Sequence, residues 1–265
     1  MRFRQNKKQD VNFARSPSKA GRKRELSNKI ITLLEQLGVD SLDEVVSDLT
    51  SESVDSKRLI TYINVISESR YLPAAFALVA LMRKTTNESI AMKAANCLHK
   101  LKTRKVTRSL ITLVSSPSSI FSRRAAIYAL WLLQDRRATP ILKKILADST
   151  EDERARSQAA EALGMLPGNK SYIFKYKDDP SPHVRCGVLC GLSVCGLGKM
   201  ERDSLRYLLK DYAVNASGVT VASVAKNVLE GEMDSDGWVE SDLSGIYIRR
   251  GRDPLDNPPT ISTLT

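Results

Sequence analysis

Residues 123–130, RRAAIYAL, are the clearest copy of a phrase that recurs along the middle of the chain. Further copies are RSQAAEALG at 156–164 and RCGVLCGL at 185–192, and a weaker copy ends at Leu98. The closing leucines are separated by 32, 33 and 29 residues. A period in this range is typical of stacked supersecondary units, because each unit leaves an apolar face that only the next unit can cover. The sequence therefore predicts an all-α solenoid of stacked antiparallel helix pairs, with small residues where helices approach closely.

Apolar residues at helical spacing predict the individual helices. The expected pairs are 57–68 with 71–83, 88–101 with 105–115, 119–133 with 138–147, 152–165 with 170–177, and 182–195 with 200–210, before a last helix near 217–230. Upstream, helical spacing begins at Leu26, and 41–44 has the pattern of a capping box. We expect no β-sheet. The predicted organisation is a basic flexible tail at 1–24, a repeat solenoid at 25–230, and an irregular or partly docked C-terminal extension at 231–265.

Residues 129–140, ALWLLQDRRATP, followed by Leu142 and Asp148, resemble the HEAT-like repeat of the phycobilisome-lyase type. Residues 156–164 match the same pattern, and His183-Val184-Arg185 supplies its Val-Arg element. The resemblance extends over about 57–230 and is good across 119–195. It implies a HEAT-like superhelix, and it leaves open a bilin-lyase-like or chaperone role for a chromophore protein. The pattern specifies a fold that hosts many unrelated functions.

Charge is distributed unevenly along the chain. Residues 1–29 carry a net charge of +8 and residues 93–146 a net charge of +11, whereas 30–92 and 147–265 each carry −4. A local excess of this kind steers charged partners, so the basic block is the strongest functional signal. Within it, Asp135 is the single acidic residue among twelve basic ones.

Second helices line the concave face of HEAT arrays, and many of the basic residues belong to turns and second helices. The predicted partner-binding stripe comprises Arg104, Lys105, Arg108, Arg136, Arg137, Lys143 and Lys144. The plainer interpretation is a solvated face. If the stripe binds, the expected partner is an acidic protein surface, and the chain is a non-catalytic scaffold or adaptor. The alternative is nucleic-acid backbone binding, for which aromatic residues are too sparse to suggest base stacking.

An arginine occupies the same position in three successive repeats, namely Arg123, Arg156 and Arg185. In the family that the sequence resembles, this arginine bonds within or between repeats, often to a turn aspartate. Asp148, and either Asp178 or Asp179, are suitable partners. A residue repeated in register usually serves the repeat, so we predict a structural role for all three.

Three other groups of residues resemble catalytic or metal-binding sites but also have simpler structural interpretations. Trp131 and Asp135 resemble the aromatic–carboxylate pair of HEAT-like DNA glycosylases, although Asp135 also matches the ordinary turn aspartate. His183 with Cys186, Cys190 and Cys195 offers zinc donors, yet two of these cysteines fall on small-residue positions. Residues 234–237 resemble the start of a calcium loop without its downstream ligands. We predict no catalytic residue, metal or cofactor.

The longest apolar run, 74–82, is too short to span a bilayer, so no membrane insertion is expected. The first residues are basic and lack the apolar stretch of a secretory signal. Three of the four cysteines lie within one helical repeat, which is poor geometry for disulfides. These features predict a reducing, cytoplasmic compartment.

Overall fold

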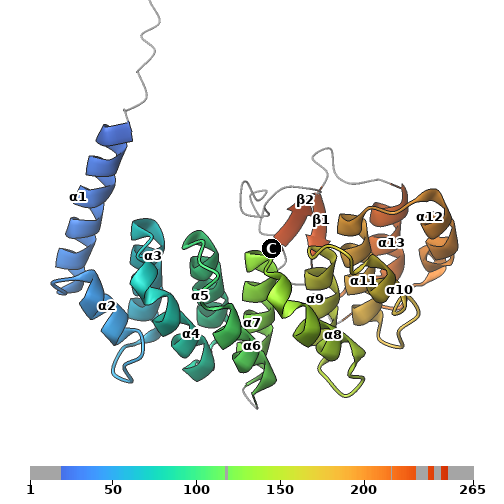
Figure 1. Ribbon diagram of the computed structural model, residues 1–265, viewed down its shortest axis with the longest axis horizontal. Helices are drawn as coiled ribbons and strands as arrows, with labels where there is room; N and C mark the ends of the chain where they lie inside the picture. Colours follow the sequence, from blue (N-terminus) through green and yellow to red (C-terminus); the bar gives the residue numbers. More distant parts are fainter. Residues whose placement is uncertain (1–18, 117–118, 216, 231–237, 242–245, 250–265) are drawn as a thin grey trace, which may run out of the picture.

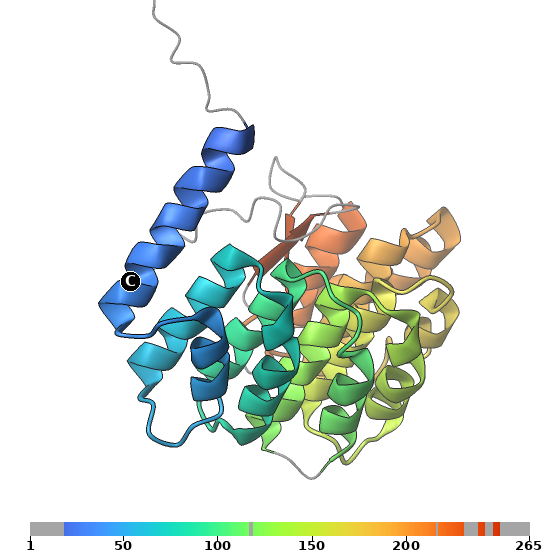
Figure 2. The ribbon, with the colours of Figure 1, turned by 60° about the vertical axis from the view of Figure 1, so that its left-hand side comes forward.

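The computed structural model describes residues 19–116, 119–215, 217–230, 238–241 and 246–249. Helix pairs follow one another along the longest axis of the molecule, and α1 projects from the N-terminal end (Figures 1 and 2). The core is one continuous apolar cluster from Val39 to Val228, as expected when every pair covers its neighbour.

The helix pairs agree closely with the sequence periodicity. The first helices of the pairs are α3 (Ser56–Ser69), α5 (Glu88–Lys100), α7 (Ile120–Leu133), α9 (Glu153–Gly164), α11 (Pro182–Cys195) and α13 (Val221–Glu230). The second helices are α4 (Ala75–Lys84), α6 (Thr107–Ser115), α8 (Thr139–Ala147), α10 (Lys170–Phe174) and α12 (Lys199–Leu205). Short 3-10 turns flank them, η1 (Leu72–Ala74), η2 (Arg136–Ala138) and η3 (Arg206–Lys210). The predicted all-α solenoid is confirmed.

Each first helix from α3 to α11 begins at a side chain that caps its N-terminus. The capping residues are Asp55, Asn87, Ser119, Asp152 and Ser181, and each accepts a hydrogen bond from the backbone N–H three residues on. Such caps satisfy donors that the helix itself leaves without partners. Because the cap recurs in every repeat, all five helices start at equivalent positions.

Helices α9 and α11 approach until their backbones touch. A Cβ added to Gly191 would lie 2.5 Å from the carbonyl oxygen of Ala160, and one added to Gly164 would lie 2.4 Å from that of Gly191. A Cβ on Gly187 would meet the Ser157 side chain at 2.4 Å. The small residues of the repeated phrase therefore have a steric cause, since larger side chains would force these two helices apart.

The ends of the chain depart from the sequence-based expectations. Helix α1 (Lys19–Leu37) begins before Leu26, inside the segment predicted to be a flexible tail. In the capping box of α2 (Leu42–Asp48), Ser41 caps as predicted, but the Glu44 carboxylate accepts from the Asp40 N–H at 2.8 Å. In the C-terminal extension, β1 (Trp238–Ser241) pairs antiparallel with β2 (Ile246–Arg249), a two-stranded hairpin that follows the all-α array in the chain.

Candidate interaction surface on the second helices

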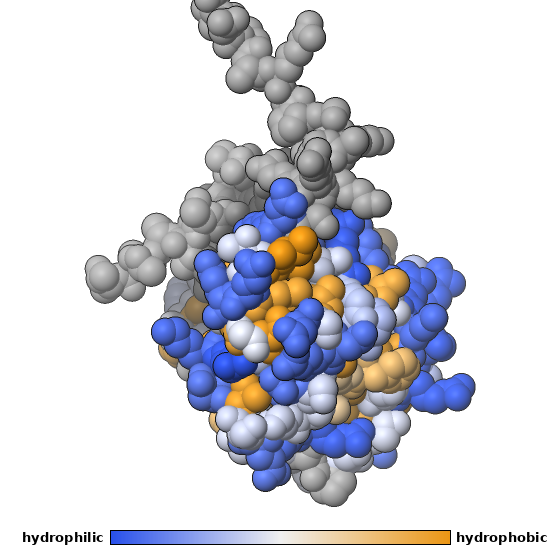
Figure 3. Space-filling view, turned by 90° about the vertical axis from the view of Figure 1, so that its left-hand side faces the viewer, coloured by the Kyte–Doolittle hydropathy of each residue, from blue (hydrophilic) through white to orange (hydrophobic). Residues whose placement is uncertain are grey.

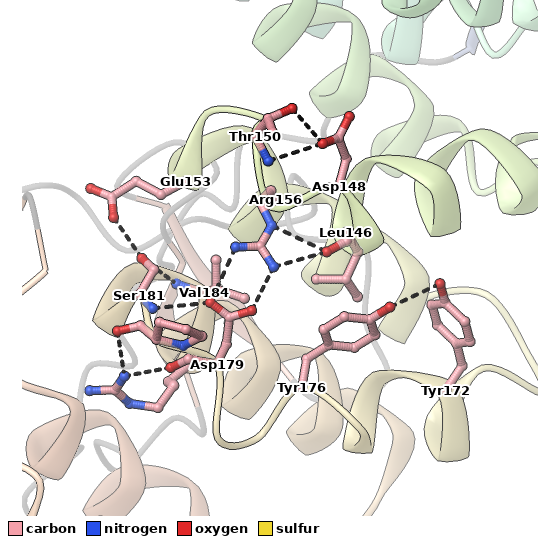
Figure 4. A network of polar contacts seen from close by, with 12 residues as sticks. Leu146, Asp148, Thr150, Glu153, Arg156, Tyr172, Tyr176, Asp179, Ser181 and Val184 are labelled. Atoms are coloured by element: carbon pink, nitrogen blue, oxygen red, sulfur yellow. Dashed lines mark hydrogen bonds and ion pairs between the residues drawn. The ribbon is translucent and has the colours of Figure 1, made fainter.

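Arg156 joins two successive repeats through a buried polar network (Figure 4). Its Nη2 lies 2.5 Å from Oδ2 of Asp179, and its Nε and Nη2 donate to the carbonyl oxygen of Leu146 at 3.2 and 3.1 Å. The two charged side chains are only 8% and 5% exposed. The Asp179 carboxylate also accepts from the Ser181 N–H at 3.0 Å, so the charge is well satisfied.

The other two repeat arginines make the same kind of link. Arg123 pairs with Glu151 at 2.5 Å and donates to the carbonyl oxygen of Ser116 at 3.3 Å. Arg185 pairs with Asp211 at 2.8 Å and donates to the carbonyl oxygen of Asp179 at 2.6 Å. Each arginine therefore ties the end of the preceding helix, or the loop after it, to the loop of the following repeat.

The acids that bind these arginines differ in part from those that the family pattern suggested. Asp179 is one of the suggested partners, whereas Asp148 accepts from Thr150, which holds the pKa of Asp148 below its usual range. The neighbouring candidate, Asp178, accepts hydrogen bonds from the Lys177 ammonium group and the Tyr207 hydroxyl. Because the three arginines are committed to contacts between repeats, their charges are not available to a partner.

Asp135 organises the turn that carries part of the predicted stripe. Its carboxylate accepts from the Thr107 hydroxyl at 2.9 Å and from the Arg137 guanidinium at 2.5 Å. These bonds, led by the one from the Arg137 side chain, lower the pKa of Asp135 to about 2. The same guanidinium donates to the carbonyl oxygen of Arg104 at 2.8 Å. The network thus joins the turn before α6 to the turn before α8.

The seven predicted stripe residues divide into two groups. Arg137 is bound to Asp135, and Lys143 lies over the Tyr172 ring with its Nζ 4.8 Å from the centroid. The Tyr172 hydroxyl donates to the carbonyl oxygen of Lys143, and burial raises the pKa of Tyr172 to about 12. The other five are exposed and form no ion pair within the described part of the chain: Arg104, Lys105, Arg108, Arg136 and Lys144.

The exposed cations lie on two neighbouring second helices and in the turns before them. Arg104 and Arg136 occupy equivalent turn positions 32 residues apart, whereas Lys144 on α8 is aligned with Thr112 on α6 rather than with a cation. Helix α6 contacts both α8 and η2, so these turns and helices form one continuous surface. We define the basic stripe as four of these five exposed residues, namely Arg104, Arg108, Arg136 and Lys144.

Two exposed apolar residues extend this surface toward the N-terminus. Leu72 and Phe76 precede Arg104 and Arg108 by 32 residues, and each is 56% exposed. Helix α4, which carries Phe76, contacts α6. Figure 3 shows apolar side chains gathered at this end of the molecule among hydrophilic ones. This pair was not predicted from the sequence, although it lies one repeat of 32 residues before Arg104 and Arg108.

Most residues of the alternative chemical sites that the structure describes are buried. Trp131 and Asp135 are 2% and 6% exposed, so neither can meet a base in a groove. His183, Cys186 and Cys190 are buried in α11. Over the residues that the structure describes, no group of three histidine, cysteine or acidic side chains has the arrangement of a metal site. The calcium-like segment 234–237 lies outside the described residues.

Within the described ranges, no helix has both the length and the apolar character needed to cross a bilayer. All four cysteines are thiols rather than disulfides. Burial raises the pKa of Cys97 to about 12, which makes that thiol a poor nucleophile at neutral pH.

The stacked pairs and the arginine links between their loops define an all-α HEAT-like solenoid. A family model described as HEAT repeats matches residues 113–174, which include α7, α8 and α9. The match supports HEAT-like repeats in general and does not extend to the phycobilisome-lyase type. HEAT repeats form helical scaffolds that mediate protein interactions. No curated protein matches the chain.

Proposed function

We propose that this protein is a non-catalytic scaffold or adaptor that binds an acidic segment of a partner protein across α4, α6 and α8. The basic stripe supplies four exposed cations that are not used in contacts between repeats. The repeat arginines, Arg137 and Lys143 belong to the framework rather than to the recognition surface. A reducing, cytoplasmic setting suits a protein with four thiols, three of them buried.

The observation that carries this proposal is the exposure of Leu72 and Phe76 one repeat away from Arg104 and Arg108. Protein interfaces combine an apolar centre with a charged rim, and large apolar side chains that fill pockets supply most of the affinity. A nucleic-acid backbone offers charged phosphates and only the small C–H faces of its sugars as apolar surface. The pairing of apolar and basic positions therefore favours a partner segment that carries acidic and apolar residues together.

Nucleic-acid backbone binding is the second candidate, because the stripe alone would also attract phosphates. It predicts an affinity for random-sequence duplex that falls steeply and linearly in log–log form with salt. The bilin-lyase-like or chaperone alternative rests on the sequence resemblance alone and stays a prediction. An acidic protein partner differs from duplex in its weaker salt dependence, because apolar contacts persist at high ionic strength.

The test reverses the basic stripe to Glu at Arg104, Arg108, Arg136 and Lys144. The probes are a labelled peptide of mixed Asp, Leu and Phe residues and a random-sequence duplex. We expect the reversal to abolish peptide binding and leave the melting midpoint nearly unchanged, since exposed charges contribute only about 0–1 kcal/mol each. Arg137 is left intact, because its loss would leave the buried Asp135 carboxylate without its cationic partner.

The matched control reverses four exposed lysines outside this surface, namely Lys57, Lys93, Lys100 and Lys199. It changes the net charge by the same amount and should leave peptide binding nearly intact. Equal loss in both variants would show that binding follows total charge, and the proposal would then fail. Binding of duplex with a steep salt slope, without peptide binding, would support the second candidate.

A further inference from the structure

A hollow of about 340 Å³ lies between α12, η3 and the C-terminal end of α13. Helices α12 and α13 contact each other, and Figure 1 shows them at the end of the array opposite α1. Leu209 and Leu229, both half-buried, supply its apolar lining. Pockets that hold small ligands measure about 300–1,000 Å³, so this hollow has room for one residue-sized group rather than for a long chain.

Arg202 lines the hollow and is fixed in place by backbone carbonyls. Its Nη1 donates to the carbonyl oxygens of Leu229 and Val228 at 2.9 and 3.3 Å, and its Nε donates to that of Leu197 at 3.3 Å. The first two bonds satisfy carbonyls at the end of α13. Within the described part of the chain, Nη2 of Arg202 forms no hydrogen bond. A guanidinium has five N–H donors, so Nη2 remains for a ligand.

The charges around the hollow favour a ligand with a single negative charge. Arg206 is paired with Asp203 at 3.1 Å, so this part of the lining is neutral. Lys199 is exposed and forms no ion pair among the described residues. Glu230, exposed at the end of α13, is the remaining acid of the lining. Lys199 and Arg202 therefore outnumber the unpaired acids by one, and a monoanion balances the charge.

Large exposed side chains beside the hollow favour a polypeptide over an isolated small acid. Met200 and Tyr207 follow the lining residues Lys199 and Arg206 in sequence, and they are 86% and 48% exposed. Met and Tyr are enriched at protein interfaces. A chain that ends in the hollow would pass over this surface, whereas a free acid of the size of the hollow would leave it uncovered.

We propose that the hollow binds the C-terminal carboxylate of a partner polypeptide whose last residue is apolar. Nη2 of Arg202 and the Lys199 ammonium group bind the carboxylate, and Leu209 and Leu229 contact the last side chain. Capture of a chain terminus is one of the recurring modes of peptide recognition. The basic stripe lies on α6 and α8 and in the turns before them, so this site does not rest on the proposed function, and either can fail without the other.

The first experiment uses the unmodified full chain and an N-acetylated neutral peptide that ends in Leu. One form has a free C-terminal carboxylate and the other a C-terminal amide. We expect the free carboxylate to bind about tenfold more tightly or better, because charged acceptors form the stronger hydrogen bonds. Methyl NMR shifts of Leu209 and Leu229 locate the bound peptide. Equal affinity of the two forms, no binding of either, or binding without shifts at these two leucines would overturn the proposal.

N-acetyl-leucine and free leucine distinguish a polypeptide from a small molecule as the source of the carboxylate. Both carry the carboxylate and the apolar side chain, but they lack the preceding residues that would pass over Met200 and Tyr207. We expect both to bind more weakly than the peptide. Met200→Ala should weaken binding of the peptide and leave that of N-acetyl-leucine unchanged. Tighter binding of either small acid than of the peptide would overturn the assignment to a polypeptide.

Arg202→Gln removes the guanidinium and should lower the affinity for the free-carboxylate peptide by about tenfold, without affecting the amide form. The matched control is Lys210→Gln, which removes an exposed cation of η3 that does not line the hollow. Equal losses in both variants would show that binding follows net charge, and the proposal would fail. Because Arg202 also supports the end of α13, Lys199→Gln at an exposed position decides if Arg202→Gln does not fold. It should weaken the free-carboxylate form severalfold and leave the amide form unchanged; no change in either form would contradict the site.

Two further comparisons separate the hollow from the basic stripe. The variant with the basic stripe reversed to Glu should bind the neutral peptide as the parent chain does. A C-terminal amide on the acidic peptide used for the stripe keeps that probe from reporting on the hollow. Loss of neutral-peptide binding in the stripe variant, with the fold intact by circular dichroism, would place the carboxylate site on the stripe and overturn the proposal.

Discussion

Arg156 and Asp179 form an ion pair between successive repeats with less than a tenth of either side chain exposed. Removing one member of such a pair leaves the other charge buried without compensation. Asp179→Ala should therefore lower the free energy of unfolding by about 3–5 kcal/mol, a typical cost for breaking a buried pair. Denaturant unfolding followed by circular dichroism measures the change.

The control for this prediction is the exposed pair Arg206–Asp203, whose side chains are 68% and 50% exposed. Asp203→Ala should change the unfolding free energy by no more than about 1 kcal/mol, because solvent screens exposed pairs. Similar costs for the two substitutions would show that burial does not govern the strength of the repeat links.

The contact between Ala160 and Gly191 gives a second prediction. Ala160→Leu or Gly191→Ala places new atoms where the α9 and α11 backbones already touch. Overpacking of this kind should destabilise the fold by about 1–3 kcal/mol. Ala147→Leu, at the exposed end of α8, adds the same side chain without a clash and serves as the control. Equal melting midpoints for Ala160→Leu and the parent would contradict the close approach.

The helix pairs were predictable because period and composition follow directly from the packing that they cause. Small residues mark the close approach of α9 and α11, and a capping residue precedes each first helix from α3 to α11, so both features recur at the repeat period. Helix boundaries from α3 to α11 consequently agree with the sequence to within a few residues, apart from the shorter α10.

The details between repeats were not predictable from periodicity. A period gives the order of the helices but not the path of the loops, so it could not choose Glu151 over Asp148 as the partner of Arg123. It also could not separate Arg136, which forms no ion pair within the described residues, from Arg137, which is held by Asp135. Strand pairing near Trp238 was missed because four-residue strands carry too little alternation to be recognised.

Asp135 should make stability depend on pH in the acid range. Its pKa falls from an ordinary 3.8 to about 2 in the folded protein, mainly through the Arg137 side chain. A depressed folded pKa contributes stability above the unfolded value, and this contribution is lost as pH falls toward about 2. Asp135→Asn should cost about 1–3 kcal/mol at neutral pH, as expected for a buried group that loses partners.

The difference in unfolding free energy between parent and Asp135→Asn should shrink as pH is lowered from about 4 to about 2. Arg137→Met should reduce the same acid dependence, because it removes the largest cause of the shift. Urea unfolding at a series of pH values measures both. A difference that stays constant over this range would show that Asp135 titrates at its ordinary value.

The final prediction separates a protein partner from a nucleic-acid partner. Leu72→Ala with Phe76→Ala removes the exposed apolar side chains beside the basic stripe without changing charge. If they anchor an acidic, apolar segment, peptide affinity should fall by tenfold or more, since truncating an anchor at an interface typically costs about 1–2 kcal/mol or more. Affinity for random-sequence duplex should be unchanged, because phosphate contacts depend on the cations alone.

Met200→Ala, at a side chain that is 86% exposed on α12, is the control for simple loss of surface area. Titration by fluorescence anisotropy measures both probes for each variant. Unchanged peptide affinity would remove the apolar contribution and, with it, the observation that favours a protein partner; equal losses on peptide and duplex would instead show that the substitutions disturb the stripe itself.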